Sequence, residues 1–185
     1  MNGLLYRSSG AICARNARKG IVMNIAEGYV MELAHEAGLT RKCLERVPAD
    51  KFGWQPHKKS MTFGTLAGHI AEIPGWTAGI IQQPEWNIDG YQAPKPASNA
   101  DLLTAFDGGV AAALAELKKT GDETMMGTWQ LKGGGQVIVE MPRVAVIRVW
   151  VLSHMIHHRG QLTVYLREND IAVPSIYGGS ADEQG

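Results

Sequence analysis

A chain of 185 residues is long enough for one domain with a sizeable hydrophobic core. Lysine and arginine balance aspartate and glutamate, so the formal net charge is zero. The sequence has no basic stripe for nucleic acid, no polybasic segment for an anionic membrane surface and no apolar run that could span a bilayer. We therefore expect neither a nucleic-acid partner nor a membrane partner.

The two cysteines, Cys13 and Cys43, are too few and too scattered for a disulfide framework or a thiolate zinc site. Two unpaired thiols fit a reducing compartment, and the expected location is cytoplasmic. A metal ion in this protein would have to rely on histidine and carboxylate ligands.

Residues 1–22 differ from the rest because they hold basic residues and serines but no acidic residue: Arg7, Ser8, Ser9, Arg15, Arg18 and Lys19. This composition resembles a transit peptide. The alternative, which we favour, is an extension that precedes a start at Met23 or Met31. We therefore divide the chain into an N-terminal extension, 1–22, and one domain, 23–185.

The first helix is predicted over 27–46, where apolar residues recur at helical spacing. Pro48 follows and stops the helix. The next segment, 49–60, is typical of a loop.

Ser60 or Thr62 caps a second predicted helix, whose apolar stripe is formed by Phe63, Leu66, Ile70, Ile73 and Ile80. His69 lies three residues after Leu66 and four before Ile73, so it faces the core. Pro74 removes one backbone hydrogen bond and predicts a kink about one turn after His69. The alternative is that Pro74 and Gly75 end the helix, but the stripe resumes beyond them.

Residues 84–97 are rich in proline and polar groups and predict a surface connection. Ser98 and Asp101 match a capping box and begin a third helix. Within 127–141, two strand-like runs flank three glycines, which predicts a β-hairpin. A phosphate-binding loop is disfavoured because strand-like residues follow these glycines, whereas such a loop needs a helix there.

Pro142 begins the longest predicted helix, which runs to about Asn169. It carries His154 and His158, which lie on one helical face about one turn apart. Two buried imidazoles repel when both are charged, and a shared cation lets both stay neutral. Together with His69 they predict a metal site with open coordination positions. The alternative is that all three are ordinary core residues.

The histidine pair is not a His-Glu-x-x-His motif, so no general-base carboxylate lies between its members. Glu72 is the nearest candidate acid or partner of His69, although an exposed helical position is the favoured interpretation. His157 is also close to His154 in register. It lies about 100° around the helix from His158, so both cannot point inward equally.

Five stretches of the chain, spread over residues 23–183, resemble the DinB-like (DinB/YfiT) family of metalloenzymes: 40–48, 54–61, 66–76, 154–162 and 173–178. The specific part is His69 combined with His-x-x-x-His-Arg-Gly-Gln at 154–161. The resemblance implies an all-α four-helix bundle with an up-down-down-up topology, to which the sequence adds a small β-hairpin before the last helix.

The resemblance also implies a divalent metal ion held by His69, His154 and His158. Zinc, nickel, iron and manganese all accept imidazole, so the residues do not choose among them. Arg159 and Gln161 match the motif and would hydrogen-bond either to neighbouring helices or to the ligand nitrogens. A homodimer is expected as well.

Some members of the family are thiol-dependent S-transferases or isomerases. The resemblance therefore implies a metal-dependent enzyme that joins a low-molecular-weight thiol to a small-molecule substrate, because a divalent cation lowers the pKa of a thiol. The alternatives are hydrolysis by metal-bound hydroxide and a non-catalytic metal-binding protein of a stress or damage response.

Overall fold

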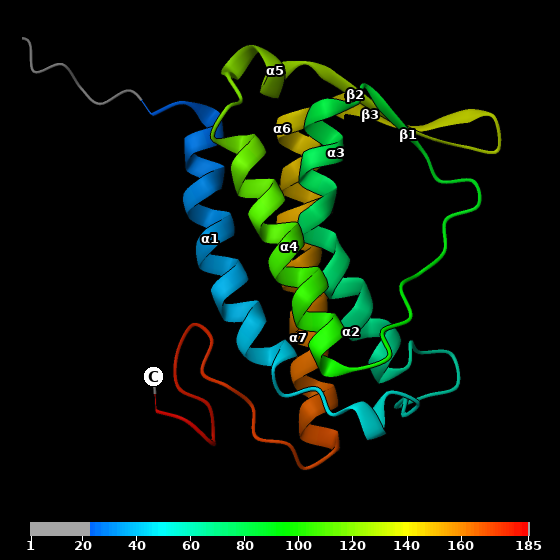
Figure 1. Cartoon of the computed structure of the whole chain (residues 1–185), viewed down its shortest axis with the longest axis vertical. Coiled ribbons are helices and arrows are strands. Elements are labelled where there is room, and N and C mark those ends of the chain that lie inside the picture. The colour runs from blue at the N-terminus through cyan, green and yellow to red at the C-terminus, as the bar shows by residue number, and fades with distance from the viewer. Residues whose placement is uncertain (1–22, 185) are drawn as a thin grey trace, which may run out of the picture.

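The computed structural model describes residues 23–184; the predicted extension 1–22 and the final residue lie outside this range. The described chain is mostly helical, with a small three-stranded sheet at one end (Figure 1). No helix within residues 23–184 has the length and apolar character needed to cross a membrane.

The first helix, α1 (Ile25–Leu44), begins two residues earlier than predicted because Asn24 caps it. The Asn24 side chain accepts a hydrogen bond from the Glu27 N–H at 2.8 Å, and the Glu27 carboxylate accepts one from the Asn24 N–H at 2.9 Å. This reciprocal capping box satisfies two N–H groups at the start of the helix. The helix ends before Pro48, as predicted, and a 3₁₀ turn (Ala49–Lys51) follows.

The predicted kink at Pro74 is confirmed. Helix α2 (Phe63–Glu72) is capped by Thr62, passes into a 3₁₀ turn (Ile73–Gly75) and continues as α3 (Trp76–Gln82). Every residue of the predicted apolar stripe is buried. Helix α4 (Asn99–Leu117) crosses this kink so closely that a Cβ atom added to Gly109 would lie 3.0 Å from the backbone nitrogen of Gly75.

The predicted hairpin is confirmed as β2 (Thr128–Gly133) and β3 (Gln136–Pro142). Gly134 and Gly135 form its turn with φ of 58° and 74°, values that favour glycine. The connection predicted over 84–97 is corrected, because it contains a third strand, β1 (Glu85–Asn87), that pairs in parallel with β2. Its partner lies more than 40 residues away, so no local pattern indicates it. A short helix, α5 (Asp122–Met126), was also not predicted.

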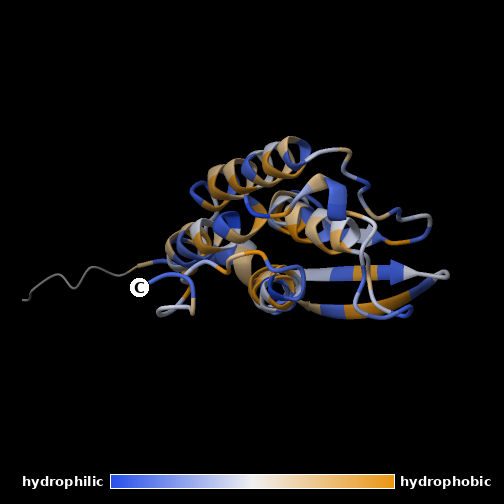
Figure 2. Cartoon of the chain, turned by 90° about the horizontal axis from the view of Figure 1, so that it is seen from below, coloured by the Kyte–Doolittle hydropathy of each residue, from blue (hydrophilic) through white to orange (hydrophobic). Residues whose placement is uncertain are grey.

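The last helix begins after Pro142, as predicted, but it is not uniform. A short α6 (Arg143–Val146) leads into a π-helical segment (Ile147–Ser153), and α7 (His154–Glu168) completes the helix. Figure 2 shows the hydrophobic stripes of the helices turned toward one another, with the strands beside them. α7 packs against both α1 and α2, and α4 packs against α1, α2 and α3.

A buried ion pair joins α7 to α1. Arg159 contacts Glu36 at 2.7 Å, and their side chains are only 3% and 8% exposed. Arg159 also donates to the hydroxyls of Thr40 and Tyr177, and the Tyr177 hydroxyl donates to Glu36. Of the two roles open to Arg159 from the sequence, the structure therefore shows the contact with a neighbouring helix.

This ion pair predicts a strong effect of one substitution. Arg159→Ala should lower the free energy of unfolding by about 3–5 kcal/mol, because it leaves the Glu36 carboxylate buried without its partner. Urea unfolding followed by circular dichroism measures the loss. Arg41→Ala is the control, since the Arg41–Asp107 pair is 40% and 48% exposed and should contribute less than about 1 kcal/mol. Equal losses in the two variants would contradict the prediction.

Candidate metal centre

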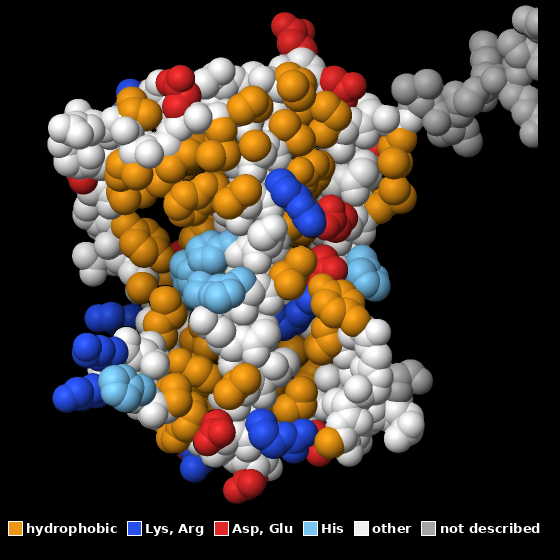
Figure 3. Space-filling model, turned by 180° about the vertical axis from the view of Figure 1, so that it is seen from behind, with side chains coloured by type: hydrophobic (Ala, Val, Ile, Leu, Met, Phe, Trp, Pro, Cys, Tyr) orange, Lys and Arg blue, Asp and Glu red, His pale blue; other side chains and the backbone are white. Residues whose placement is uncertain are grey.

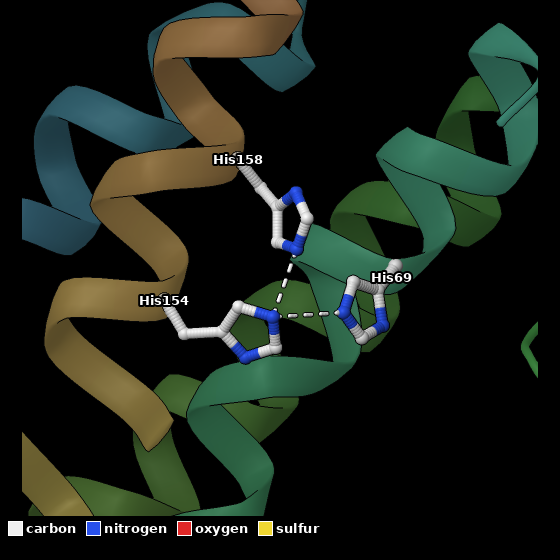
Figure 4. A group of neighbouring side chains, drawn as sticks. All are labelled: His69, His154 and His158. Carbon is white, nitrogen blue, oxygen red and sulfur yellow. Dashed lines mark hydrogen bonds between the residues drawn. The ribbon is translucent and has the colours of Figure 1, made fainter. Parts of the chain in front are cut away.

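The three histidines singled out by the sequence come together where α2 meets α7. His154 Nε2 lies 3.4 Å from His69 Nε2 and 2.8 Å from His158 Nε2 (Figure 4). One nitrogen of each ring falls within 4.8 Å of the other two. Zinc–nitrogen bonds of about 2.1 Å at tetrahedral angles place two ligand nitrogens about 3.4 Å apart. The donor atoms therefore have the type and spacing to hold one divalent ion.

Each imidazole is oriented through its other nitrogen. His69 Nδ1 lies 2.7 Å from the Glu72 carboxylate, His154 Nδ1 lies 3.3 Å from the Trp150 carbonyl, and His158 Nδ1 lies 2.7 Å from the Gln161 amide oxygen. All three partners are acceptors, so each Nδ1 carries the proton. The three Nε2 atoms are then left with lone pairs that face one another. Such partners of the second ring nitrogen are typical of histidines that bind metals.

The Trp150 carbonyl that contacts His154 lies in the π-helical segment. In an α-helix the carbonyl of Trp150 would accept from the backbone N–H four residues later, whereas a π-helix shifts that bond by one residue. The carbonyl of Trp150 is then within reach of the His154 side chain. The acceptor of a candidate ligand thus lies in a local irregularity of the helix, which the sequence pattern did not predict.

Burial disfavours the charged forms of His154 and His158. Desolvation, followed by the neighbouring His158 and His69 rings, lowers the pKa of His154 to about 4. Desolvation also lowers the pKa of His158, against the opposing hydrogen bond from Gln161. The lowered pKa values of His154 and His158 leave these two rings with lone pairs at neutral pH, and a neutral imidazole is the form that binds a metal ion.

The structure settles the roles of the neighbouring residues. His157 is exposed and is not one of the three clustered histidines, although its ring centroid lies 5.0 Å from that of His158 and its Nε2 lies 3.1 Å from the Gln161 amide nitrogen. The expectation that Glu72 is an exposed helical residue is wrong, because its side chain is 18% exposed and accepts hydrogen bonds from both His69 and Tyr91. Tyr91 lies in a connection that passes close to Gly68, so this contact was not visible in the local sequence.

A large cavity opens beside the cluster, with a volume of about 550 Å³. His69 and His154 form part of its wall, together with Trp76, whose ring centroid lies 5.5 Å and 5.7 Å from those of the two histidines. Figure 3 shows histidine side chains gathered beside a hollow that hydrophobic side chains border. A molecule in this cavity would approach the three nitrogens from the side of His69 and His154.

A second, shallower hollow of about 290 Å³ lies on the other side of Trp150. Its wall includes Ser153, His154 and His157. His154 and Trp150 therefore belong to both hollows, and the candidate metal centre can be approached from two directions.

Fold and site together define a mostly helical protein with three buried or half-buried histidines that could hold a metal ion. Residues 23–184 match the DinB family, and the chain belongs to this family. The resemblance seen in the sequence is thereby confirmed.

One curated relative and two solved structures show what else this chain is similar to. The uncharacterized protein YrdA of Bacillus subtilis (strain 168) is 28% identical over 156 residues, which cover 80% of this chain and 85% of that protein. A DinB-like protein from Bacillus cereus ATCC 10987 has a similar fold, with a TM-score of 0.64, 23% identity and coverage of 82% of this chain and 97% of that chain. The DinB-like protein YjoA of Bacillus subtilis has a TM-score of 0.63, 20% identity and coverage of 85% and 99%.

The convergence of the three rings predicts which histidines matter for metal binding. His154→Ala should abolish the binding of one divalent ion per chain, since His154 is adjacent to both other ligand nitrogens. His157→Ala should leave binding unchanged, because its side chain is exposed, and so should changes at the exposed His35 and His57. Metal content after dialysis against zinc, nickel, iron or manganese, measured by mass spectrometry, tests this. Full occupancy in His154→Ala would disprove the ligand set.

The lowered histidine pKa values predict how stability depends on pH in the metal-free protein. Unfolded His154 takes up a proton near pH 6.5, whereas the folded residue does so only near its pKa of about 4. The unfolded chain therefore binds more protons in this window, and stability should fall as pH drops from about 6.5 toward 4. Urea unfolding at several pH values measures the slope. His154→Gln should flatten the slope, and His35→Gln should not; equal slopes in both variants would contradict the assignment.

Proposed function

We propose that this protein binds one divalent metal ion through His69, His154 and His158 and acts as a metal-dependent thiol S-transferase on small molecules. The observation that supports the metal site is the convergence of one nitrogen from each of the three rings, with an acceptor beside the Nδ1 of each ring. Three neutral ligands leave the charge of a divalent ion uncompensated, and open coordination positions remain.

The surroundings of the site favour a thiol as the nucleophile. When bound, a divalent cation supplies a Lewis acid that lowers the pKa of a thiol or of water. Glu72 already accepts hydrogen bonds from His69 and Tyr91, and the Asp89 carboxylate in the cavity wall accepts one from the Gly134 N–H. Both carboxylates are thus already engaged with donors of the fold, and a general base for peptide or ester hydrolysis would have to share or give up these contacts. A thiol supplies its own acidic proton and avoids this requirement.

The thiol must come from outside the described chain. Cys43, the free cysteine within residues 23–184, is fully buried in the core, and desolvation raises its pKa to about 11. Buried thiols of this kind are inert. The two hollows that meet at His154 provide space for two reactants, a low-molecular-weight thiol and its electrophilic partner.

We further propose that the fold is a four-helix bundle with up-down-down-up topology, in which α2–α3 and α6–α7 each form one continuous kinked or irregular helix. In support, Figure 1 shows α1 and α7 running in one direction and α2, α3 and α4 in the other. The contacts of α1 and α2 with both α4 and α7 are those of neighbouring helices in such a bundle.

A paired substrate screen tests the function. Metal-loaded protein is supplied with cysteine, glutathione and other cellular thiols together with a chromogenic aryl halide, in which the C–S bond forms and halide leaves. We expect conjugation that depends on metal and is lost in His158→Ala, while His35→Ala, at an exposed position of α1, retains it. A parallel screen of esters and amides without thiol serves as the contrast.

Three outcomes separate the rival functions. Efficient ester hydrolysis without thiol would replace the transferase by a metal-hydroxide hydrolase. Silence in both screens, with stoichiometric metal bound, would favour a non-catalytic metal-binding protein of a stress or damage response. Conjugation that persists in His158→Ala would exclude the three-histidine centre as its source.

A further inference from the structure

Aromatic side chains dominate the wall of the large cavity. Four of the five tryptophans of the chain line it, together with one tyrosine: Trp76, Trp86, Trp129, Trp150 and Tyr91. Ile80, Ile88, Leu131 and Val146 complete the apolar surface. A cavity of about 550 Å³ has the size of a site for a small organic molecule.

The small sheet builds one side of this wall. Trp86 pairs with Leu131 in the parallel register of β1 and β2, and Trp129 lies two residues before Leu131. Side chains two residues apart in a strand share a face, so the sheet presents both tryptophans and Leu131 to the cavity. The ring centroids of Trp86 and Trp129 lie 6.1 Å apart, and those of Trp76 and Trp86 lie 6.3 Å apart, both in edge-to-face arrangements.

A glycine in α3 fixes the position of Trp86. A Cβ atom added to Gly79 would lie 2.7 Å from the Trp86 ring, closer than real atoms approach. The indole therefore packs directly on the helix backbone, because Gly79 has no side chain. This contact holds the ring of a strand residue against α3 and completes the wall between sheet and helix.

Three polar side chains in the wall already have partners, whereas the buried indole N–H of Trp129 has none among the described residues. The Asn87 side chain accepts from the Asp89 N–H, the Asp89 carboxylate accepts from the Gly134 N–H, and the Tyr91 hydroxyl donates to Glu72. Among the described residues, no lysine or arginine lines the cavity. A bound anion would lose its hydration without gaining a cationic partner, whereas an uncharged ring can pack against the indoles edge to face or offset.

We propose that this cavity binds an uncharged aromatic group of a small molecule and holds it beside His69 and His154. The identification of that molecule as the electrophile rests on the proposed function, whereas the binding of the ring does not. The aromatic wall lies on the His69 and His154 side of the cluster, so it would position the reacting atom of the substrate next to the candidate metal centre.

Isothermal titration calorimetry with two matched probes tests the proposal. The probes are 2-naphthalenemethanol, which is uncharged, and 2-naphthoate, which has the same rings and a negative charge. Both are titrated into the wild-type protein and into His158→Ala, where a metal ion cannot attract the carboxylate. In His158→Ala we expect the naphthoate to bind at least tenfold more weakly than the alcohol.

Two cavity variants and one control locate the binding. Trp86→Ala removes one aromatic wall, and Leu131→Trp fills space within the cavity; each should weaken alcohol binding at least tenfold. Trp54→Phe is the control and should change it less than twofold, because Trp54 packs against Phe63 and Tyr165 and not in the cavity wall. Nuclear Overhauser effects between naphthyl protons and indole protons of the wild-type protein locate the ring even if a variant fails to fold.

Several results would overturn the proposal: no binding of the alcohol, equal binding of both probes in His158→Ala, unchanged affinity in both cavity variants, or contacts to Trp54 in place of Trp86. Ring binding without any thiol conjugation would leave this proposal standing and count against the transferase alone. Conjugation without ring binding would overturn this proposal and leave the transferase standing.

Discussion

The candidate centre depends on the hydrogen bond that each imidazole makes through Nδ1. Three acceptors of different kinds, the Glu72 carboxylate, the Trp150 carbonyl and the Gln161 amide, place the proton on Nδ1 and turn Nε2 inward. Without these acceptors each ring could rotate and could carry its proton on either nitrogen. The three Nε2 atoms would then not be held facing one another. These acceptors come from α2, the π-helical segment and α7. The positions of these helical segments therefore determine the orientation of the three rings.

The elements around the centre maintain this arrangement. The ion pair between Arg159 and Glu36 lies one residue after His158 and fixes α7 against α1. Tyr91 connects the far side: its hydroxyl donates to the same Glu72 oxygen that orients His69, so the 88–98 connection contributes both to the cavity wall and to the position of a candidate ligand. A molecule that displaces Tyr91 would therefore also act on His69, which physically couples the cavity to the metal centre.

Contacts between residues close in the sequence were predicted, whereas contacts between distant residues were not. The helix at His69, its kink at Pro74, the hairpin and the turn spacing of His154 and His158 all follow from residues within about ten positions of each other, and each was predicted. The strand at Trp86, the partner of Arg159 and the contact of Tyr91 with Glu72 involve residues 19 to 123 positions apart, and local patterns could not reveal them. The role of Glu72 was misjudged for the same reason.

By itself, the sequence determined which histidines can face the interior, because helical periodicity fixes the side of the helix on which a residue lies. It also determined that no thiolate site is available and that the glycine-rich segment forms a turn. Only the tertiary structure decided that the three rings meet, which nitrogen of each faces inward, and that four tryptophans from four different segments enclose one cavity beside them. The physical reason is that ring orientation and cavity shape arise from packing between distant segments. The hydrophobic periodicity of a sequence indicates only which face of one helix or strand is buried.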